Sequence, residues 1–168
     1  TNWHDANIGC DIRGTDWDMK NIEDDTIIMG IMQSEDYFGH HKEEIKKWLK
    51  VKEEHDTHEY TKDNLCIMNF RGGEYMNSPT LVSKRYWEKA MDNMRQVRSD
   101  MEFMVVTDDV ASAKTFFPDL PCHHFDVGKD YAVIKNAKHV VLSNSTFAFF
   151  PVFTSDTIEN IVAPKYWA

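Results

Sequence analysis

The chain has 168 residues, and its 42% of apolar residues suffice for the core of one domain, or of one domain with a fragment of another. A formal net charge of −9 and an isoelectric point near 5.3 argue against nonspecific binding to nucleic acid or to anionic membranes, which needs a clustered basic face. A phosphate-bearing ligand must therefore be held by local geometry.

Three cysteines, Cys10, Cys66 and Cys122, are widely spaced and include no Cys-x-x-Cys pair. This pattern predicts reduced thiols in a cytosolic protein rather than a disulfide framework. No apolar run approaches the ~20 residues of a membrane-spanning helix, and the first residues do not resemble a secretion signal. We therefore expect a cytoplasmic protein without a membrane span; the sequence indicates no oligomeric state.

The first part of the chain is less regular than the second. Residues 1–25 are polar and acidic without a clear period, so loops are expected, and the β-branched run 26–32 predicts a strand. Residues 36–53 have apolar positions at mixed helical spacing and predict one amphipathic helix, with a break considered at Gly39. The hydrophilic segment 53–63 marks the best boundary. We therefore expect two parts, residues 1–60 and residues 61–168.

Beyond this boundary, strand-like and helix-like segments alternate. The expected strands cover residues 65–70, 102–107, 122–126, 139–142 and 159–163, and the expected helices cover residues 83–97, 109–116, 128–137 and 146–155. Strands separated by helices pair in parallel through right-handed crossovers. The sequence therefore predicts an α/β fold, a Rossmann-like parallel sheet flanked by helices.

Two of these strands end in residues suited to phosphate. The strand 65–70 runs into Arg71 and the pair Gly72-Gly73, which lets the backbone turn sharply and approach a ligand closely. The strand 139–142 runs into the small polar residues 143–146. Two such strand ends in one parallel sheet converge on one crevice, where we expect the ligand.

Four segments of the chain resemble the alpha-1,2-fucosyltransferase family. They are residues 30–38 (Gly-Ile-Met-Gln-Ser-Glu-Asp-Tyr-Phe), 69–75 (Asn-Phe-Arg-Gly-Gly-Glu-Tyr), 106–109 (Val-Thr-Asp-Asp) and 143–147 (Ser-Asn-Ser-Thr-Phe). They occur in the family's order and roughly at its spacing. The family's loop usually reads His-x-Arg-Arg-Gly-Asp-Tyr; here Asn69 stands at the histidine, Arg71 at the first arginine, Gly72 at the second arginine and Glu74 at the aspartate.

The resemblance implies an inverting, metal-independent transferase of the GT-B type that moves fucose from GDP-fucose to a glycan hydroxyl, with no cofactor. Its partners would be a GDP-sugar donor and a glycan acceptor, in the cytoplasm or peripheral to a membrane where glycans are assembled. The family begins with a Gly-Gly-Leu-Gly-Asn-Gln strand and turn that this chain lacks. We therefore expect a fragment, with residues 1–60 as a remnant of the acceptor-side domain and residues 61–168 as the nucleotide-sugar-binding domain.

The resemblance assigns donor-site roles to several residues. Arg71 would stabilise the diphosphate leaving group, because a guanidinium can make two hydrogen bonds to its oxygens; the alternative is a structural pair with Glu74. Ser145 and Thr146, with Asn144 beside them, would hold the β-phosphate at a helix N-terminus, and Phe147 would pack beside the donor. The alternative for this segment is ordinary N-capping.

Each of three further carboxylates has two interpretations, and one amide stands where the family has a histidine. Asp108 and Asp109 would accept hydrogen bonds from guanine, or would cap a helix. Asn69 retains hydrogen-bonding capacity near the nucleotide. Glu74 would be the general base, with a pKa raised by partial burial, or would orient Arg71 and tie down the glycine loop.

Three histidine pairs, His40-His41, His55-x-x-His58 and His123-His124, suggest a metal site, but their spacing lacks a matching set of ligands. We expect no metal. Two alternative functions remain open, a noncatalytic GDP-sugar-binding module and a transferase for a different GDP-sugar.

Overall fold

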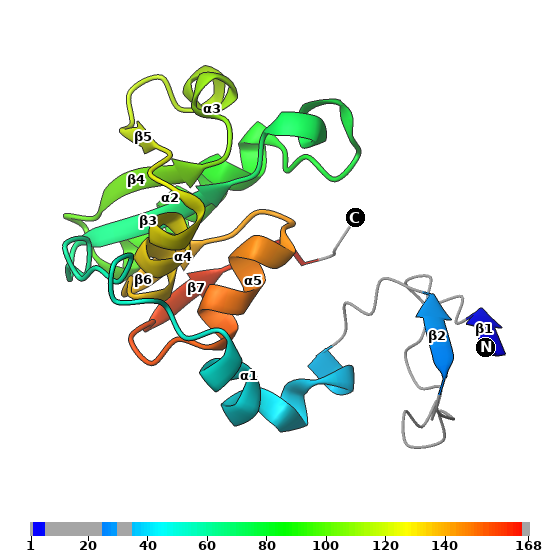
Figure 1. Ribbon diagram of the computed structural model, residues 1–168. Coiled ribbons are helices and arrows are strands. Elements are labelled where there is room, and N and C mark those ends of the chain that lie inside the picture. The colour runs from blue at the N-terminus through cyan, green and yellow to red at the C-terminus, as the bar shows by residue number, and fades with distance from the viewer. Residues whose placement is uncertain (1, 6–24, 30–34, 166–168) are drawn as a thin grey trace. The chain divides into compact units, whose positions relative to one another are not determined.

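The computed structural model describes residues 2–5, 25–29 and 35–165, and the chain forms two units, residues 1–45 and 46–168 (Figure 1). In the first unit, strand β1 (Asn2–Asp5) pairs in parallel with β2 (Thr26–Met29). The prediction of loops throughout residues 1–25 is therefore wrong for Asn2–Asp5. A four-residue strand is too short to show a period, and its partner lies more than twenty residues away in the sequence. Residues 30–34 of the first resembling segment, and Cys10, lie outside the described residues.

The expected helix over residues 36–53 is shorter and less regular than predicted. Two 3-10 turns, Glu35–Tyr37 and Gly39–His41, precede helix α1 (Lys42–Trp48). Helix α1 ends at Trp48, and a separate turn follows in which the N–H groups of His55 and Asp56 both donate to the carbonyl of Lys52.

The hydrophilic segment after α1 lies within the second unit and is held there by the buried amide of Asn136. The side chain of Asn136 donates to the Asp56 carboxylate at 2.7 Å and to the Thr57 carbonyl at 2.9 Å, while the Thr61 hydroxyl donates to the Asn136 carbonyl at 2.8 Å. The segment is irregular, as expected, but it is held at both of its ends. The division into parts at residue 60 stays a prediction.

The second unit contains a five-stranded parallel sheet in the order β5-β4-β3-β6-β7 (Figure 1). The strands are β3 (Leu65–Phe70), β4 (Glu102–Thr107), β5 (Cys122–His123), β6 (His139–Val141) and β7 (Asn160–Val162). The helices are α2 (Lys84–Val97), α3 (Val110–Phe116), α4 (Val127–Lys135) and α5 (Thr146–Phe153), and a 3-10 turn covers Gly73–Asn77. The predicted Rossmann-like α/β fold is confirmed.

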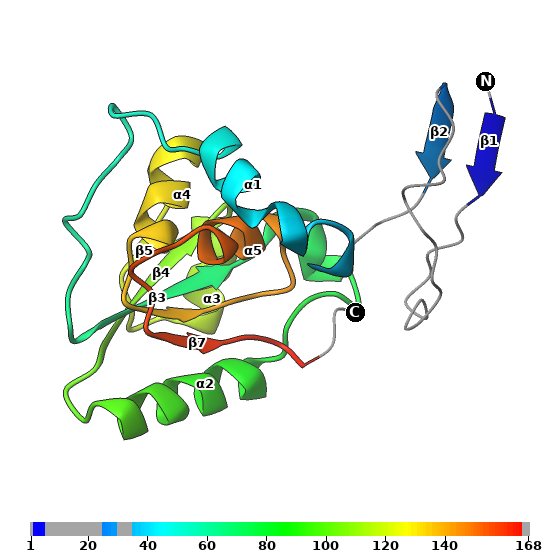
Figure 2. The same cartoon turned by 90° about the horizontal axis from the view of Figure 1, so that it is seen from below.

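Helices cover both faces of this sheet, as Figure 2 shows for α2 on one side and for α4 and α5 on the other. Successive residues of β3 alternate between the two cores, because side chains along a strand point to opposite faces. Met68 and Phe70 pack with α2 and α3, whereas Ile67 packs with α4 and α5. All six residues of β3 are buried, as a central parallel strand requires.

Strand β5 ends at His123, three residues before the predicted end. The reason is that the Phe125 N–H donates to the Asp130 carboxylate at 3.0 Å, which turns the chain into α4. Cys66 and Cys122 are free and buried, and burial raises the pKa of the Cys66 thiol to about 12. Within the described part of the chain, no helix has both the length and the apolar character that a bilayer crossing demands.

The core between the sheet and α2 is built around Trp87, which is 1% exposed and contacts the rings of Phe70, Tyr86 and Phe117. We expect Trp87→Ala to lower the free energy of unfolding by about 3–5 kcal/mol through lost burial and a cavity. Trp87→Phe should cost less, because the indole N–H has no hydrogen-bond partner among the described residues.

Urea denaturation followed by circular dichroism measures both changes. Val97→Ala is the control, because Val97 is exposed at the end of α2 and its truncation should change stability by less than about 0.5 kcal/mol. Equal losses for Trp87→Ala and Val97→Ala would contradict the assignment of Trp87 to the core.

Candidate functional site

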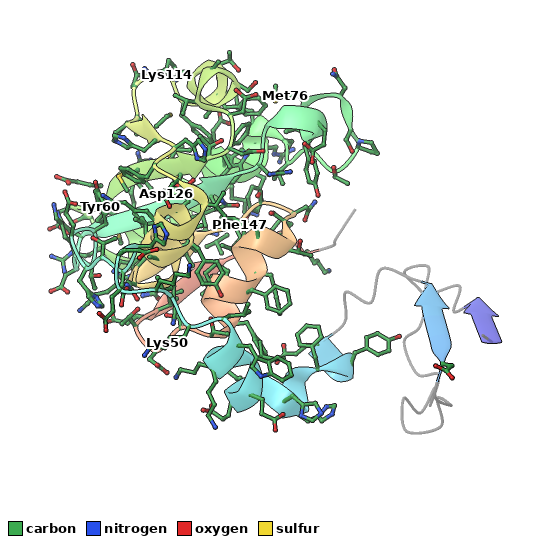
Figure 3. All side chains as sticks on the ribbon, viewed as in Figure 1. Lys50, Tyr60, Met76, Lys114, Asp126 and Phe147 are labelled. Carbon is green, nitrogen blue, oxygen red and sulfur yellow. The ribbon has the colours of Figure 1, made fainter. Side chains whose placement is uncertain are left out.

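A pocket lies where the carboxyl ends of β3 and β4 meet the loops before α4 and α5. Figure 3 shows two of the residues of this region, Asp126 before α4 and Phe147 near the start of α5. The residues that line the pocket come from the ends of β3 and β4, from the segments that follow β5 and β6, and from α4 and α5: Asn69, Phe70, Arg71, Val106, Thr107, Asp108, His124, Val127, Asp130, Ser145 and Phe147. The two strand ends singled out by sequence, after residues 70 and 142, therefore open into one pocket.

The Arg71 side chain lies between two carboxylates. Its Nη2 is 2.6 Å from Glu74 Oε1, and its Nη1 is 2.7 Å from Asp108 Oδ2. The guanidinium also lies over the ring of Tyr75, with its central carbon 5.4 Å from the ring centroid. Three neighbours thus fix the orientation of a group that is 31% exposed at the pocket.

The glycine pair after Arg71 is bound to the two aspartates that follow β4. The Gly72 N–H donates to Asp108 Oδ1 at 2.9 Å, and the Gly73 N–H donates to Asp109 Oδ2 at 3.3 Å. Gly73 has φ +51°, a conformation that glycine adopts without cost. A Cβ atom on Gly72 would lie 2.7 Å from the Cβ of Asp109, so the loop cannot approach β4 this closely with a side chain at position 72.

The structure separates the two aspartates that the sequence left equivalent. Asp109 is the N-cap of α3 and accepts from the Ser112 N–H at 3.0 Å. The hydrogen bond from the Ser112 side chain is the largest cause that lowers the pKa of Asp109. Asp108 instead lines the pocket and pairs with Arg71. The helix-cap interpretation therefore holds for Asp109, and Asp108 is the better candidate for a ligand contact.

A buried serine at the start of α5, Ser145, lines the pocket. Ser145 is the N-cap residue, yet its side chain makes no capping hydrogen bond, and it is 5% exposed. Phe147 also lines the pocket and meets the ring of Tyr131 in a T-shaped contact. Thr146 is exposed and is absent from the pocket lining. The ordinary capping interpretation therefore does not describe the Ser145 hydroxyl.

Two predicted amides have structural partners. Asn69 is 5% exposed; its Nδ2 donates to the Val106 carbonyl at 3.5 Å, and its Oδ1 accepts from the Ser143 hydroxyl at 3.0 Å. It thereby ties β3 to β4 and to the end of β6 while one side of it lines the pocket. Asn144 donates to the Thr80 carbonyl at 3.3 Å, and its buried Oδ1 has no partner among the described residues.

The expectation of a partly buried Glu74 with a raised pKa is wrong. The side chain is 68% exposed, and the hydrogen bond from Arg71 is the main cause that lowers its pKa. A largely exposed carboxylate paired with a guanidinium is a weak proton acceptor. The geometry fits the alternative interpretation, in which Glu74 orients Arg71.

Sequence reasoning missed a histidine–aspartate pair in the same pocket. His124 Nδ1 lies 2.6 Å from Asp130 Oδ2, and both residues line the pocket. Burial is the largest cause that raises the pKa of Asp130. The signal available was a histidine within the predicted strand 122–126. Among the described residues, no group of three possible metal ligands lies together.

The close approach of Gly72 to Asp109 predicts that restoring an arginine at position 72 damages the loop. In Gly72→Arg the new Cβ must push the loop away from Asp109, which breaks the hydrogen bond from the Gly73 N–H. We expect faster amide hydrogen exchange at Gly73, measured by nuclear magnetic resonance. Asn77→Ala, an exposed position in the same loop, is the control and should leave that exchange unchanged. Unchanged exchange in Gly72→Arg would show that the loop has room for a side chain.

The pairing with Arg71 also predicts how Glu74 titrates. In the folded protein the pKa of Glu74 lies below its ordinary value of 4.5, and Arg71→Ala should raise it toward that value. Because the folded pKa is lowered, the stabilisation from this pair is present above the unfolded pKa and is lost as the pH falls through the folded pKa.

Carbon-13 shifts of the side-chain carboxyl groups measure this titration. Asp109 is the internal control, since its pKa is lowered mainly by the Ser112 hydrogen bond and should stay low in Arg71→Ala. A Glu74 pKa above 4.5 in the unaltered chain would return this residue to consideration as a general base.

With this geometry established, comparisons with known proteins identify the family. The model of glycosyl transferase family 11 matches residues 13–167. No curated protein sequence matches the chain. Among solved structures, a high-resolution crystal structure of POFUT1 in complex with GDP is similar, with a TM-score of 0.45 and 10% identity over 74% of this chain and 47% of that chain. A third crystal form of POFUT1 with GDP has a TM-score of 0.45 and 11% identity over 74% and 46%.

The chain thus spans about half the length of the solved structures that it matches. The family match covers nearly all of the sequence, including the four resembling segments, and it confirms that resemblance. The chain belongs to glycosyl transferase family 11, the family of alpha-1,2-fucosyltransferases.

Proposed function

We propose that these residues form the donor-binding part of a GT-B-type fucosyltransferase, which transfers fucose from GDP-fucose to a glycan hydroxyl with inversion. The observation that carries the proposal is the convergence of Arg71 and Ser145 on one pocket, from the ends of two strands that are adjacent in the sheet. A guanidinium and an uncapped hydroxyl at a helix N-terminus are suited to a diphosphate.

Arg71 is proposed to stabilise the leaving group. As the bond between fucose and the β-phosphate breaks, negative charge grows on the diphosphate, and a cation oriented in advance lowers the energy of that transition state. Glu74 accepts one hydrogen bond from Arg71 and Asp108 forms an ion pair with it; the guanidinium has five N–H donors, so donors remain for the ligand. Their role in this proposal is to hold the guanidinium in place.

The start of α5 is proposed to bind the β-phosphate through the Ser145 hydroxyl and the N–H groups of the first helical turn. Thr146 and Phe147 begin that turn, and the helix dipole favours an anion there. Asn144 is proposed to support this segment through its bond to the Thr80 carbonyl. Because Arg71 and the helix start together supply positive charge, we propose that transfer needs no metal.

The nucleoside is proposed to lie beside Asp108 and Asn69. Asp108 is the better placed of the two predicted aspartates, and each of its oxygens retains a second lone pair beyond the bonds to Arg71 and Gly72. In an inverting transfer the acceptor hydroxyl attacks from the side opposite the diphosphate, through an oxocarbenium-like transition state. The acceptor glycan must therefore reach the open side of the donor pocket.

Calorimetric titration with GDP and with GDP-fucose tests the proposal. We expect micromolar binding, and we expect Arg71→Ala to weaken it at least about tenfold, since a hydrogen bond to a charged group contributes about 1.5–3 kcal/mol. Arg95→Ala is the matched control, because Arg95 pairs with Asp92 on α2 and does not line the pocket. Unchanged affinity in Arg71→Ala, or equal losses in both variants, would overturn the assignment of the diphosphate site.

A noncatalytic module that binds a GDP-sugar, or a transferase for another GDP-linked sugar, remains the alternative, because Asn69 and Gly72 depart from the family's loop. The same titration separates these cases. Preference for GDP-fucose over GDP-mannose supports the fucosyl donor, whereas equal affinity for GDP and for both GDP-sugars favours the binding module.

A further inference from the structure

We propose that His124 is a specificity-determining residue of the donor pocket, whose Nε2 accepts a hydrogen bond from the nucleoside of the ligand. The donor of this hydrogen bond is an N–H on the Watson–Crick edge of guanine or the ribose 2′-hydroxyl. This inference rests on the proposed function and adds a residue that the family's four segments do not include.

The geometry of the pair fixes which nitrogen faces the ligand. Oδ1 of Asp130 accepts from the Phe125 N–H at 3.0 Å, and Oδ2 lies 2.6 Å from His124 Nδ1. Asp130 is 5% exposed, so the buried carboxylate holds the imidazole in one orientation. His124 is 44% exposed and lines the pocket, and among the described residues none hydrogen-bonds its Nε2.

When the imidazole of His124 is neutral, its contact with Asp130 also selects the tautomer. A carboxylate that accepts from Phe125 on one oxygen accepts from Nδ1–H of His124 on the other. A neutral imidazole that donates through Nδ1 has a lone pair on Nε2 and can only accept there. The site therefore selects a ligand group that carries an N–H or an O–H.

The position in the sheet points to the nucleoside rather than to the sugar. Arg71 and Ser145 mark the diphosphate at the ends of β3 and β6, whereas His124 follows β5, on the far side of β4. The transferred sugar must face the acceptor, so it lies toward solvent. The part of the pocket beside His124, beyond β4, is left for the nucleoside.

The charged groups near His124 and Asp130 do not compete with the ligand for Nε2 of His124. Asp126 caps α4 by accepting from the Lys129 N–H and pairs with His55, and Lys129 Nζ lies over the ring of Phe125. None of these side chains lines the pocket.

The test compares His124→Phe with His123→Phe. Both substitutions keep a ring, but His123 stacks on Phe125 and does not line the pocket, so it is the matched control. Titration calorimetry measures the affinity for GDP, for IDP, which lacks the 2-amino group, and for 2′-deoxy-GDP. We expect His124→Phe to weaken GDP binding about three- to tenfold, the range for one neutral hydrogen bond, and His123→Phe to leave it unchanged.

The analogues identify the donor group. If the unaltered protein binds one analogue more weakly than GDP and His124→Phe removes that difference, the contact is the group that this analogue lacks. An equal loss for all three ligands assigns the contact to N1–H, which they share. This inference alone is overturned if Arg71→Ala weakens GDP binding while His124→Phe leaves it unchanged. Equal losses in His123→Phe and His124→Phe also overturn this inference alone. Absence of GDP binding by the unaltered protein overturns the proposed function and this inference with it.

Discussion

The structure of the pocket depends on how the loop after β3 is bound to the loop after β4. Two neighbouring strands of a parallel sheet end side by side, and here the donors of one loop meet the carboxylates of the other: Arg71 and Gly72 bind Asp108, and Gly73 binds Asp109. This contact sets the direction of the guanidinium. It also requires the absence of a side chain at position 72, where the neighbouring chain passes too close for a Cβ atom.

This arrangement is how the proposed anion site would work in a chain with a net charge of −9. Within the pocket lining, Arg71 is accompanied by the carboxylates of Asp108 and Asp130. The electrostatic field in the pocket depends on how the nearby donors are placed rather than on the net charge of the chain, because Arg71 and the start of α5 border the same pocket. The guanidinium of Arg71 keeps N–H donors beyond those that face the two carboxylates.

Contacts to α4 and to the residue after it hold two irregular segments of the second unit in place. The segment between α1 and β3 is fastened to Asn136 after α4, and the chain after β5 is turned by Asp130 within α4. His124 therefore takes its orientation from a residue on the following helix. Asn69, which stands where the family carries a histidine, is occupied with the sheet through Val106 and Ser143, while the imidazole in the pocket comes from His124.

The sequence by itself determined the α/β alternation and the two strand ends that carry Arg71 and Ser145, because hydrophobic period and turn residues are local properties. Strands 65–70 and 102–107 have the predicted bounds for this reason. Only the tertiary structure decided the rest. Which of Asp108 and Asp109 faces Arg71 depends on how the loop after β3 meets the loop after β4, and the contact of His124 with Asp130 depends on how the chain after β5 meets α4. No local pattern encodes those distances, nor the exposure of Glu74.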